Sequence, residues 1–181
     1  VSVGSPLDLA AGGAALARGF NRVYTQMFLA SLKPKALAQG QQFPGIANAD
    51  RLRASRNLYE FDNEYTAPVH GFRDTDDYWT RASAKPVLGR IGLPTLVLNA
   101  RNDPFMPDTA FPRSEELSPF VLCEFPEQGG HVGFVGAPFP GNVDWLPRRV
   151  TEFFEGAISG RKAGSPLRTD GIMAPQRAAA R

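Results

Sequence analysis

The chain has 181 residues, of which 43% are hydrophobic and 21% are charged, and its formal net charge at pH 7 is +2. This composition is typical of a globular protein and excludes a disordered chain or one that is membrane-like in bulk. The weak basic charge accompanies no nucleic-acid-binding motif, so we expect no nucleic-acid partner.

Signals for membrane insertion, export and metal binding are missing from the sequence. No apolar run approaches the roughly 18 residues of a spanning helix, and no signal peptide is recognisable. We therefore expect a cytoplasmic protein, although contact with a membrane and a signal or anchor upstream are left open. Cys123 cannot form an internal disulfide and is interpreted as a small core residue. His70 and His131 match no metal-ligand spacing, so we expect no metal and no cofactor.

A short strand is expected at the start of the chain, and a long, mostly helical region follows it as far as Pro94. In this region an apolar stripe recurs at helical spacing, and we expect it to pack in the core. The stripe consists of Leu16, Phe20, Val23, Tyr24, Met27 and Phe28. Further along, Asp74 is predicted to cap a helix that begins near Thr75 and that Pro86 interrupts.

Two short apolar runs predict buried parallel strands at 94–98 and 120–125. Polar segments follow both runs, and they place Asp103 in NARNDPF and His131 in QGGHVGF. These residues are 28 positions apart, about the length of one strand–helix–strand crossover. Because reactive groups collect at the carboxyl ends of parallel strands, we expect Asp103 and His131 to meet there.

A carboxylate that accepts a hydrogen bond from one imidazole nitrogen leaves the other nitrogen able to take a proton from a nucleophile. Asp103 and His131 would then be two thirds of a catalytic triad. The alternative is structural, because Asp-Pro commonly starts a turn and Gly-Gly-His can be a tight turn that ends in a surface histidine.

The last predicted element is a helix over 143–158, with Pro147 tolerated in its first turn. Its expected inner face consists of Trp145, Leu146, Val150, Phe153, Phe154 and Ile158. Residues 159–181 are rich in Ala, Gly, Pro and Arg without an apolar period, which predicts a disordered tail.

Several segments together resemble the YheT-like branch of the α/β-hydrolase superfamily. They are GFNRVY at 19–24, LKPKAL from Leu32, HGF at 70–72, PTL at 94–96, ARNDPFM and GGHVGF. The resemblance covers about residues 1 to 155. It implies that Asp103 is the triad acid, that His131 is the triad base, and that the chain has an α/β fold of parallel strands with a helical lid inserted at about 12–92. Residues 1–158 would be the C-terminal half of the hydrolase domain.

The nucleophile of this family is a Ser in a Gly-x-Ser-x-Gly turn between a strand and a helix, upstream of the acid and the base. No serine of the chain stands in that motif. The serines are Ser2, Ser5, Ser31, Ser55, Ser83, Ser114, Ser118, Ser159 and Ser165. We therefore expect the chain to open after the nucleophile, either as part of a longer protein or as a chain whose start was placed too late.

The resemblance implies a serine hydrolase of carboxylic esters whose substrate is a small-molecule acyl ester or acylglycerol. Phe72, Tyr78 and Trp79 are candidates for the wall of its acyl pocket, although each is also a normal core residue. Two alternatives stay open. One is an inactive remnant or interaction module, and the other is pairing with a separately encoded N-terminal half that supplies the Ser. The unpaired edge of the first strand would favour such pairing or aggregation.

Overall fold

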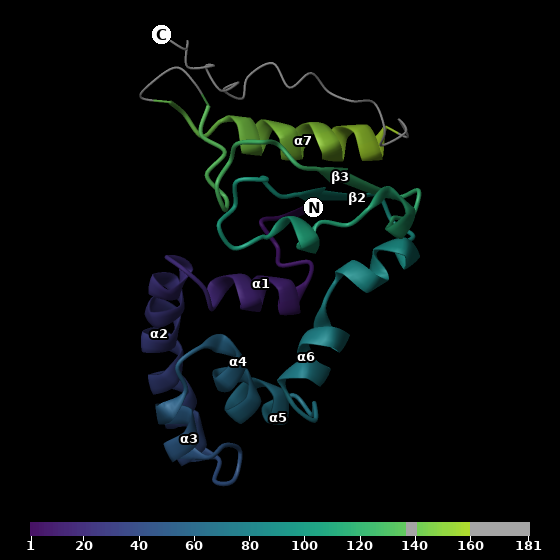
Figure 1. Ribbon diagram of the computed structural model, residues 1–181. Coiled ribbons are helices and arrows are strands. Elements are labelled where there is room, and N and C mark those ends of the chain that lie inside the picture. Colours follow the sequence, from purple (N-terminus) through teal and green to yellow (C-terminus); the bar gives the residue numbers. More distant parts are fainter. Residues whose placement is uncertain (137–140, 160–181) are drawn as a thin grey trace. The chain divides into compact units, whose positions relative to one another are not determined.

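The computed structural model describes residues 1–136 and 141–159, and it forms two compact units (Figure 1). The sheet unit contains Val1–Ser5, Leu88–Asp103 and the chain from Arg113 onward, and the helical unit contains Pro6–Val87 and Pro104–Pro112. Apart from Ser159, the tail predicted at 159–181 lies outside the described residues.

The sheet unit is built on a parallel sheet of three strands in the order β1-β2-β3. These strands are β1 (Ser2–Val3), β2 (Thr95–Leu98) and β3 (Val121–Glu124). The two neighbours pair parallel to β2, with Ser2 and Cys123 both in register with Val97. Among the described residues, β1 pairs on one side only. The predicted strands and the α/β class are therefore confirmed, and the central strand is the most deeply buried.

Helix α7 (Trp145–Ile158) lies along one face of the sheet, as predicted (Figure 1). Phe153 packs in a core with Leu96 and Leu98 of β2. The predicted inner face is wrong at two positions, because Phe154 is 49% exposed and Ile158 is 86% exposed. Successive helical residues differ by about 100° around the axis, so an inward Phe153 turns Phe154 outward.

Arg149 of α7 is buried, which the sequence did not predict. Its guanidinium forms a bidentate ion pair with the carboxylate of Glu124 at the end of β3, with Nε 2.8 Å from Oε2. This pairing neutralises a cation that would otherwise be buried alone between helix and sheet.

The connection between β2 and β3 contains no α-helix, contrary to the predicted crossover. It contains only two short 3₁₀ turns, η3 (Asp108–Ala110) and η4 (Ser114–Glu116). Proline removes a helical hydrogen bond and clashes with the preceding turn. The connection contains four prolines, namely Pro104, Pro107, Pro112 and Pro119.

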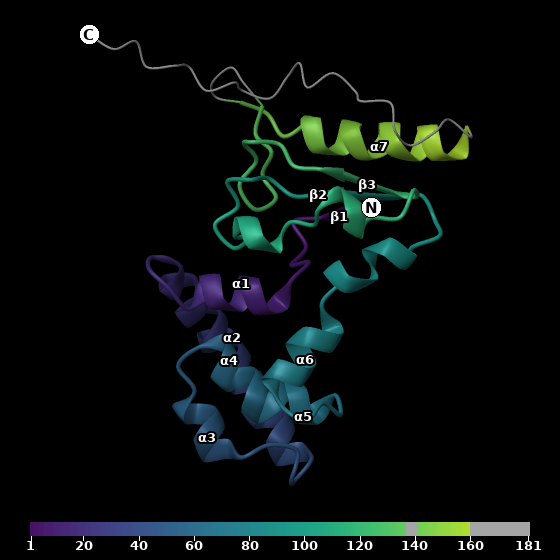
Figure 2. The same cartoon turned by 45° about the vertical axis from the view of Figure 1, so that its right-hand side comes forward.

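The helical unit groups six short and medium helices around a small core, together with a π-helical turn (Figure 2). The elements are α1 (Leu9–Leu16), α2 (Asn21–Gln42), α3 (Ala49–Ala54), α4 (Leu58–Phe61), the π-helix η1 (Asp62–Thr66), α5 (Ala67–Val69) and α6 (Thr75–Ala82). A 3₁₀ segment, η2 (Lys85–Arg90), follows. None of the helices in the described ranges is long and apolar enough to cross a membrane.

The apolar stripe predicted at 16–28 is not one helix, and four of its six residues are exposed instead of core. Helix α1 ends at Leu16, Gly19 adopts φ +52°, and α2 begins at Asn21. Helix α2 is buried through Leu29, which packs with Leu52. Four apolar side chains on the opposite face of α2 and directly before the helix are exposed. They are Phe20, Val23, Met27 and Phe28.

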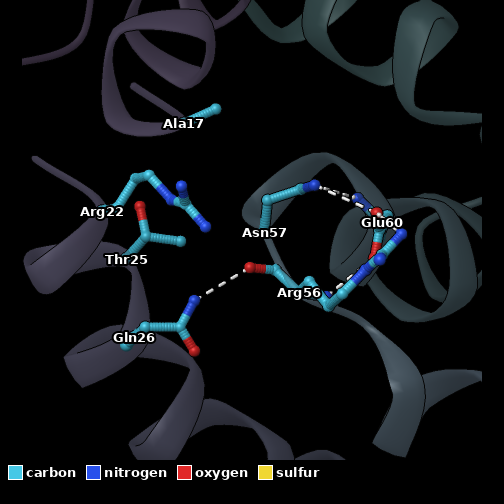
Figure 3. Close-up of a pocket in the computed structure, with 7 residues that line it drawn as sticks. All are labelled: Ala17, Arg22, Thr25, Gln26, Arg56, Asn57 and Glu60. Carbon is cyan, nitrogen blue, oxygen red and sulfur yellow. Dashed lines mark hydrogen bonds and ion pairs between the residues drawn. The ribbon is translucent and has the colours of Figure 1, made fainter. Parts of the chain in front are cut away.

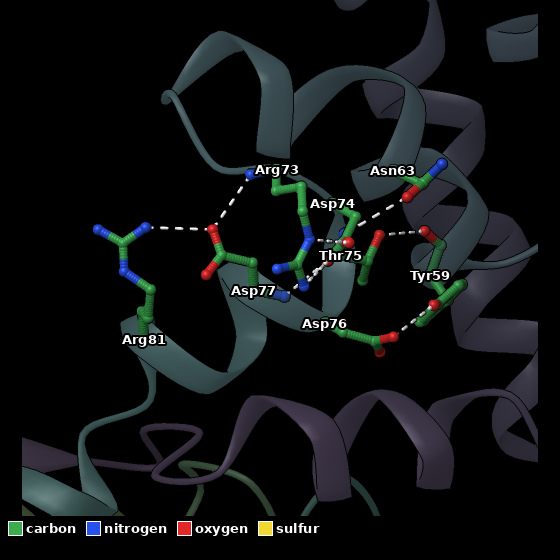
Figure 4. A network of polar contacts seen from close by, with 8 residues as sticks. All are labelled: Tyr59, Asn63, Arg73, Asp74, Thr75, Asp76, Asp77 and Arg81. Atoms are coloured by element: carbon green, nitrogen blue, oxygen red, sulfur yellow. Dashed lines mark hydrogen bonds and ion pairs between the residues drawn. The ribbon is translucent and has the colours of Figure 1, made fainter.

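Asp74 caps helix α6 as predicted, because its Oδ1 accepts a hydrogen bond from the backbone N–H of Asp77 at 2.8 Å (Figure 4). The Arg73 guanidinium hydrogen-bonds the Asp74 carboxylate and lowers its pKa. The helix ends at Ala82 and not at Pro86. At this end the Ser83 hydroxyl accepts from the N–H of Leu9 at 2.9 Å, and the backbone becomes extended.

Candidate active site

Asp103 and His131 meet in the sheet unit, on the loops that leave the neighbouring strands β2 and β3. Oδ2 of Asp103 lies 2.8 Å from Nδ1 of His131. The Asp103 side chain is fully buried, whereas that of His131 is 43% exposed. The expected juxtaposition is therefore present, with a shielded carboxylate on one ring nitrogen and an imidazole that solvent reaches.

The loop that carries Asp103 is held by backbone hydrogen bonds to the exit of β3. The N–H of Asn99 donates to the carbonyl of Glu124 at 3.2 Å, and that of Arg101 donates to Pro126 at 2.8 Å. The N–H of Asp103 then closes a turn on the carbonyl of Ala100. These bonds fix the carboxylate because they tie its backbone to the strand that precedes His131.

The loop that carries His131 is a tight turn closed by the N–H of Phe134, which donates to the carbonyl of Gly129 at 2.9 Å. A Cβ on Gly129 would lie 2.6 Å from the Phe134 ring and 2.7 Å from Cβ of Ala100. Phe134 itself has φ +43°, a conformation that non-glycine residues rarely adopt. Its ring is buried and stacks on Trp145 with centroids 5.3 Å apart. The packed ring holds the strained turn in place.

The first strand also reaches this site, through Gly4, which the sequence analysis did not single out. Gly4 has φ +60°, and a Cβ there would lie 2.7 Å from the carbonyl oxygen of His131 and 3.4 Å from its Cε1. The site therefore combines the ends of all three strands. A glycine directly after a predicted strand was the available signal.

Asn99 links the exits of β2 and β1. Its buried Nδ2 donates to the carbonyl of Ser5 at 3.1 Å, which ties the chain after Gly4 to the central strand. Its Oδ1 is also buried, and it has no hydrogen-bond partner among the described residues. This amide holds β1 beside the Asp103 loop.

The three acyl-pocket candidates belong to the helical unit. Trp79 is buried, and its Nε1 donates to Asp62 at 2.8 Å. Phe72 contacts Tyr78 with centroids 5.2 Å apart, and the guanidinium of Arg81 lies 4.9 Å above the Phe72 ring. These contacts support packing, and a role in substrate binding stays a prediction.

A polar cavity of about 220 Å³ also lies within the helical unit (Figure 3). It is lined by Ala17, Arg22, Thr25, Gln26, Arg56, Asn57 and Glu60. The Glu60 carboxylate accepts the backbone N–H of Arg56 at 2.7 Å, and this bond lowers its pKa. The hydroxyl of Thr25 donates to the carbonyl of Leu16 at 2.7 Å. Nε2 of Gln26 donates to the carbonyl of Arg56 at 2.9 Å, which links α2 to the segment before α4.

Cysteine nucleophilic catalysis and metal binding receive no support from the described residues. Burial raises the pKa of the Cys123 thiol to about 11, which opposes a thiolate nucleophile. Within residues 1–136 and 141–159, no group of three His, Cys, Asp or Glu side chains is placed to hold a metal ion.

Comparison with known proteins agrees with the family resemblance described in the sequence analysis. YheT of Escherichia coli, a protein named as an esterase, is 38% identical over 155 residues, which cover 84% of this chain. The chain is related to the YheT-like α/β-hydrolases. Phospholipase ABHD3 of Mus musculus is 33% identical over 110 residues, and monoacylglycerol lipase ABHD2 of Homo sapiens is 29% identical over 108.

The chain spans about half the length of YheT, 46%, and about a quarter of the length of the two lipid hydrolases, 27% and 25%. No family model matches the chain, and no solved structure matches it at a significant level. The relationship therefore rests on these partial sequence alignments.

Proposed function

We propose that Asp103 and His131 are the acid and base of a serine hydrolase that cleaves carboxylic esters. The observation that carries this proposal is the 2.8 Å contact between a buried Asp103 carboxylate and a solvent-accessible His131 ring. The order Asp before His, each after a parallel strand, is also the order of α/β-hydrolase triads.

In this mechanism Asp103 fixes the tautomer of His131 that carries its proton on Nδ1. The Nε2 atom can then take the proton of an attacking serine hydroxyl and return it to the leaving alcohol. The carboxylate stabilises the imidazolium that forms between these two steps. The chemistry needs no cofactor.

The ester substrate class is supported by the names of the relatives. The names describe an esterase, a phospholipase and a monoacylglycerol lipase, whose substrates are esters, phospholipids and acylglycerols. The shared chemistry is an acyl group joined to an alcohol oxygen. We propose a small-molecule acyl ester or acylglycerol as the substrate.

The serine of this mechanism is proposed to come from a longer form of the protein, because none of the serines of the chain stands in a Gly-x-Ser-x-Gly motif. That same observation favours a second candidate function, a remnant or interaction module that no longer catalyses. Supply of the serine by a separately encoded chain is a variant of the first candidate.

A fluorophosphonate probe followed by intact-mass spectrometry separates these candidates. We expect no covalent adduct on residues 1–181 alone. A form extended upstream to include the serine motif should carry one adduct and hydrolyse p-nitrophenyl esters. A stoichiometric adduct on a serine of the 181-residue chain would contradict the proposal. If the extended form folds but neither reacts nor hydrolyses, the remnant is correct.

A further inference from the structure

The side chain of Asn102 connects the loop of the proposed acid to the loop of the proposed base. Its Oδ1 accepts a hydrogen bond from the backbone N–H of Gly130 at 2.8 Å. Its Nδ2 donates to Oε1 of Gln128 at 2.9 Å. Asn102 immediately precedes Asp103, and Gly130 immediately precedes His131.

The neighbours Asn102 and Asp103 therefore bind a second pair of neighbours, Gly130 and His131, on the facing loop. Asp103 contacts the His131 ring, and Asn102 holds the backbone one residue earlier. We propose that Asn102 is a positioning residue, which fixes the backbone of the His131 loop so that the imidazole stays aligned with Asp103. The catalytic meaning of this inference rests on the proposed function, but the positioning itself does not.

The backbone at Gly130 has a particular need for this bond. Gly130 has φ +60°, and nothing lies within 4 Å of the position that a Cβ would occupy there. Side-chain packing therefore does not hold this residue, and glycine has the greatest backbone freedom to lose. The hydrogen bond from its N–H to Asn102 supplies the restraint that packing does not.

The chemistry of an amide explains why asparagine suits this position. An amide offers an acceptor for Gly130 and a donor for Gln128 on two separate atoms of one short, neutral side chain. Asn102→Ala removes both bonds. Asn102→Asp keeps the acceptor and loses the donor, and Gln128→Ala removes only the partner of the donor.

We would test the inference by NMR on the 181-residue chain and these three variants. The readouts are the hydrogen-exchange rate of the Gly130 amide and the ring ¹⁵N shifts of His131, which report its tautomer. Asn48→Ala is the matched control, because Asn48 also accepts backbone N–H groups, at the start of α3. It lies in the helical unit.

In Asn102→Ala, the Gly130 amide should exchange about tenfold faster, as expected for one lost hydrogen bond. The His131 ring should lose its single Nδ1–H tautomer. The Gly130 amide should exchange as slowly in Asn102→Asp as in the wild type. Gln128→Ala should speed this exchange less than Asn102→Ala does. The control Asn48→Ala should change neither readout. Unchanged exchange and tautomer in a folded Asn102→Ala chain would overturn the inference. If that variant fails to fold, fast exchange in Asn102→Asp would overturn it.

An activity measurement on the extended, serine-containing form separates this inference from the proposed function. Misplacement of a catalytic group by about 1 Å can cost about 100-fold in rate. Asn102→Ala should therefore lower kcat by 10- to 100-fold, by the same principle, and leave KM nearly unchanged. If His131→Ala keeps full activity, the proposed function fails while the NMR result still decides the role of Asn102.

Discussion

Gly4, directly after β1, lies against the backbone carbonyl and the ring of His131, on the loop that leaves β3. The two residues follow strands on opposite sides of β2, so this contact brings the chain after both outer strands to the site. The N–H of Gly4 also donates to the carbonyl of Leu98 at 2.9 Å. His131 is thereby flanked by Asp103 and by Gly4, while its side chain stays 43% exposed to solvent.

Gly4→Ala is expected to destabilise the sheet unit and displace His131. The change imposes about 1 kcal/mol of backbone strain at positive φ. It also places a methyl group 2.7 Å from the His131 oxygen. Urea unfolding and the His131 ring signals measure the two effects. Gly19→Ala is the control, since Gly19 has φ +52° with open space around it. Equal losses of stability in Gly4→Ala and Gly19→Ala, together with unchanged His131 ring signals, would contradict this role for Gly4.

His131→Ala and Asp103→Asn should each reduce ester hydrolysis by about 10⁴-fold in the extended, serine-containing form. The first variant removes the base, and the second favours the wrong tautomer of His131. Acylation rates from a pre-steady-state burst measure the loss directly. Near-normal turnover in either folded variant would refute the assignment.

The sequence predicted correctly that Asp103 and His131 lie together, because both residues follow short apolar runs that form neighbouring parallel strands. The supporting residues were not predicted. A glycine after a strand indicates a close backbone approach, but no local pattern shows that Gly4 meets residue 131 or that Asn102 meets residue 130. Strand ends are local properties, whereas these contacts depend on the register of the sheet.

Helical periodicity located apolar residues on α2 but did not decide which face is buried. The stripe of Phe20 and Met27 was predicted to be core, yet the helix packs through Leu29. Both faces of α2 are apolar, so the face that becomes buried is decided by its packing partners, Leu52 and Phe61. Similarly, the periodicity of α7 gave Phe153 correctly and could not reveal that Arg149 would find Glu124.

Breaking the Arg149–Glu124 pair should destabilise the sheet unit strongly. Arg149→Ala leaves the partly buried carboxylate of Glu124 without its cation, and loss of one partner of a buried pair costs about 3 kcal/mol. Replacing both, as Arg149→Met with Glu124→Leu, should recover most of that loss. Chemical denaturation of the single and double variants measures the coupling. If the double variant loses as much stability as the two single variants together, the ion pair is not the source of the loss.

Acidification should weaken the start of helix α6 through Asp74. Hydrogen bonds from the Arg73 side chain and the Asp77 N–H lower its pKa from the usual 3.8. A carboxyl group whose pKa falls on folding stabilises the protein above 3.8 and loses this contribution as the pH drops through the lowered value.

Asp74→Asn keeps a capping oxygen but cannot titrate, so it isolates the charge from the cap. Wild type should have the higher urea midpoint at pH 7, and the difference from Asp74→Asn should shrink as the pH falls below about 3.8, the usual value for this group. Asp74→Ala should lower the midpoint further at pH 7, because the N–H of Asp77 then loses its partner within the helix start. A difference between wild type and Asp74→Asn that stays constant from pH 7 to the acid limit would show that the charge of Asp74 does not stabilise α6.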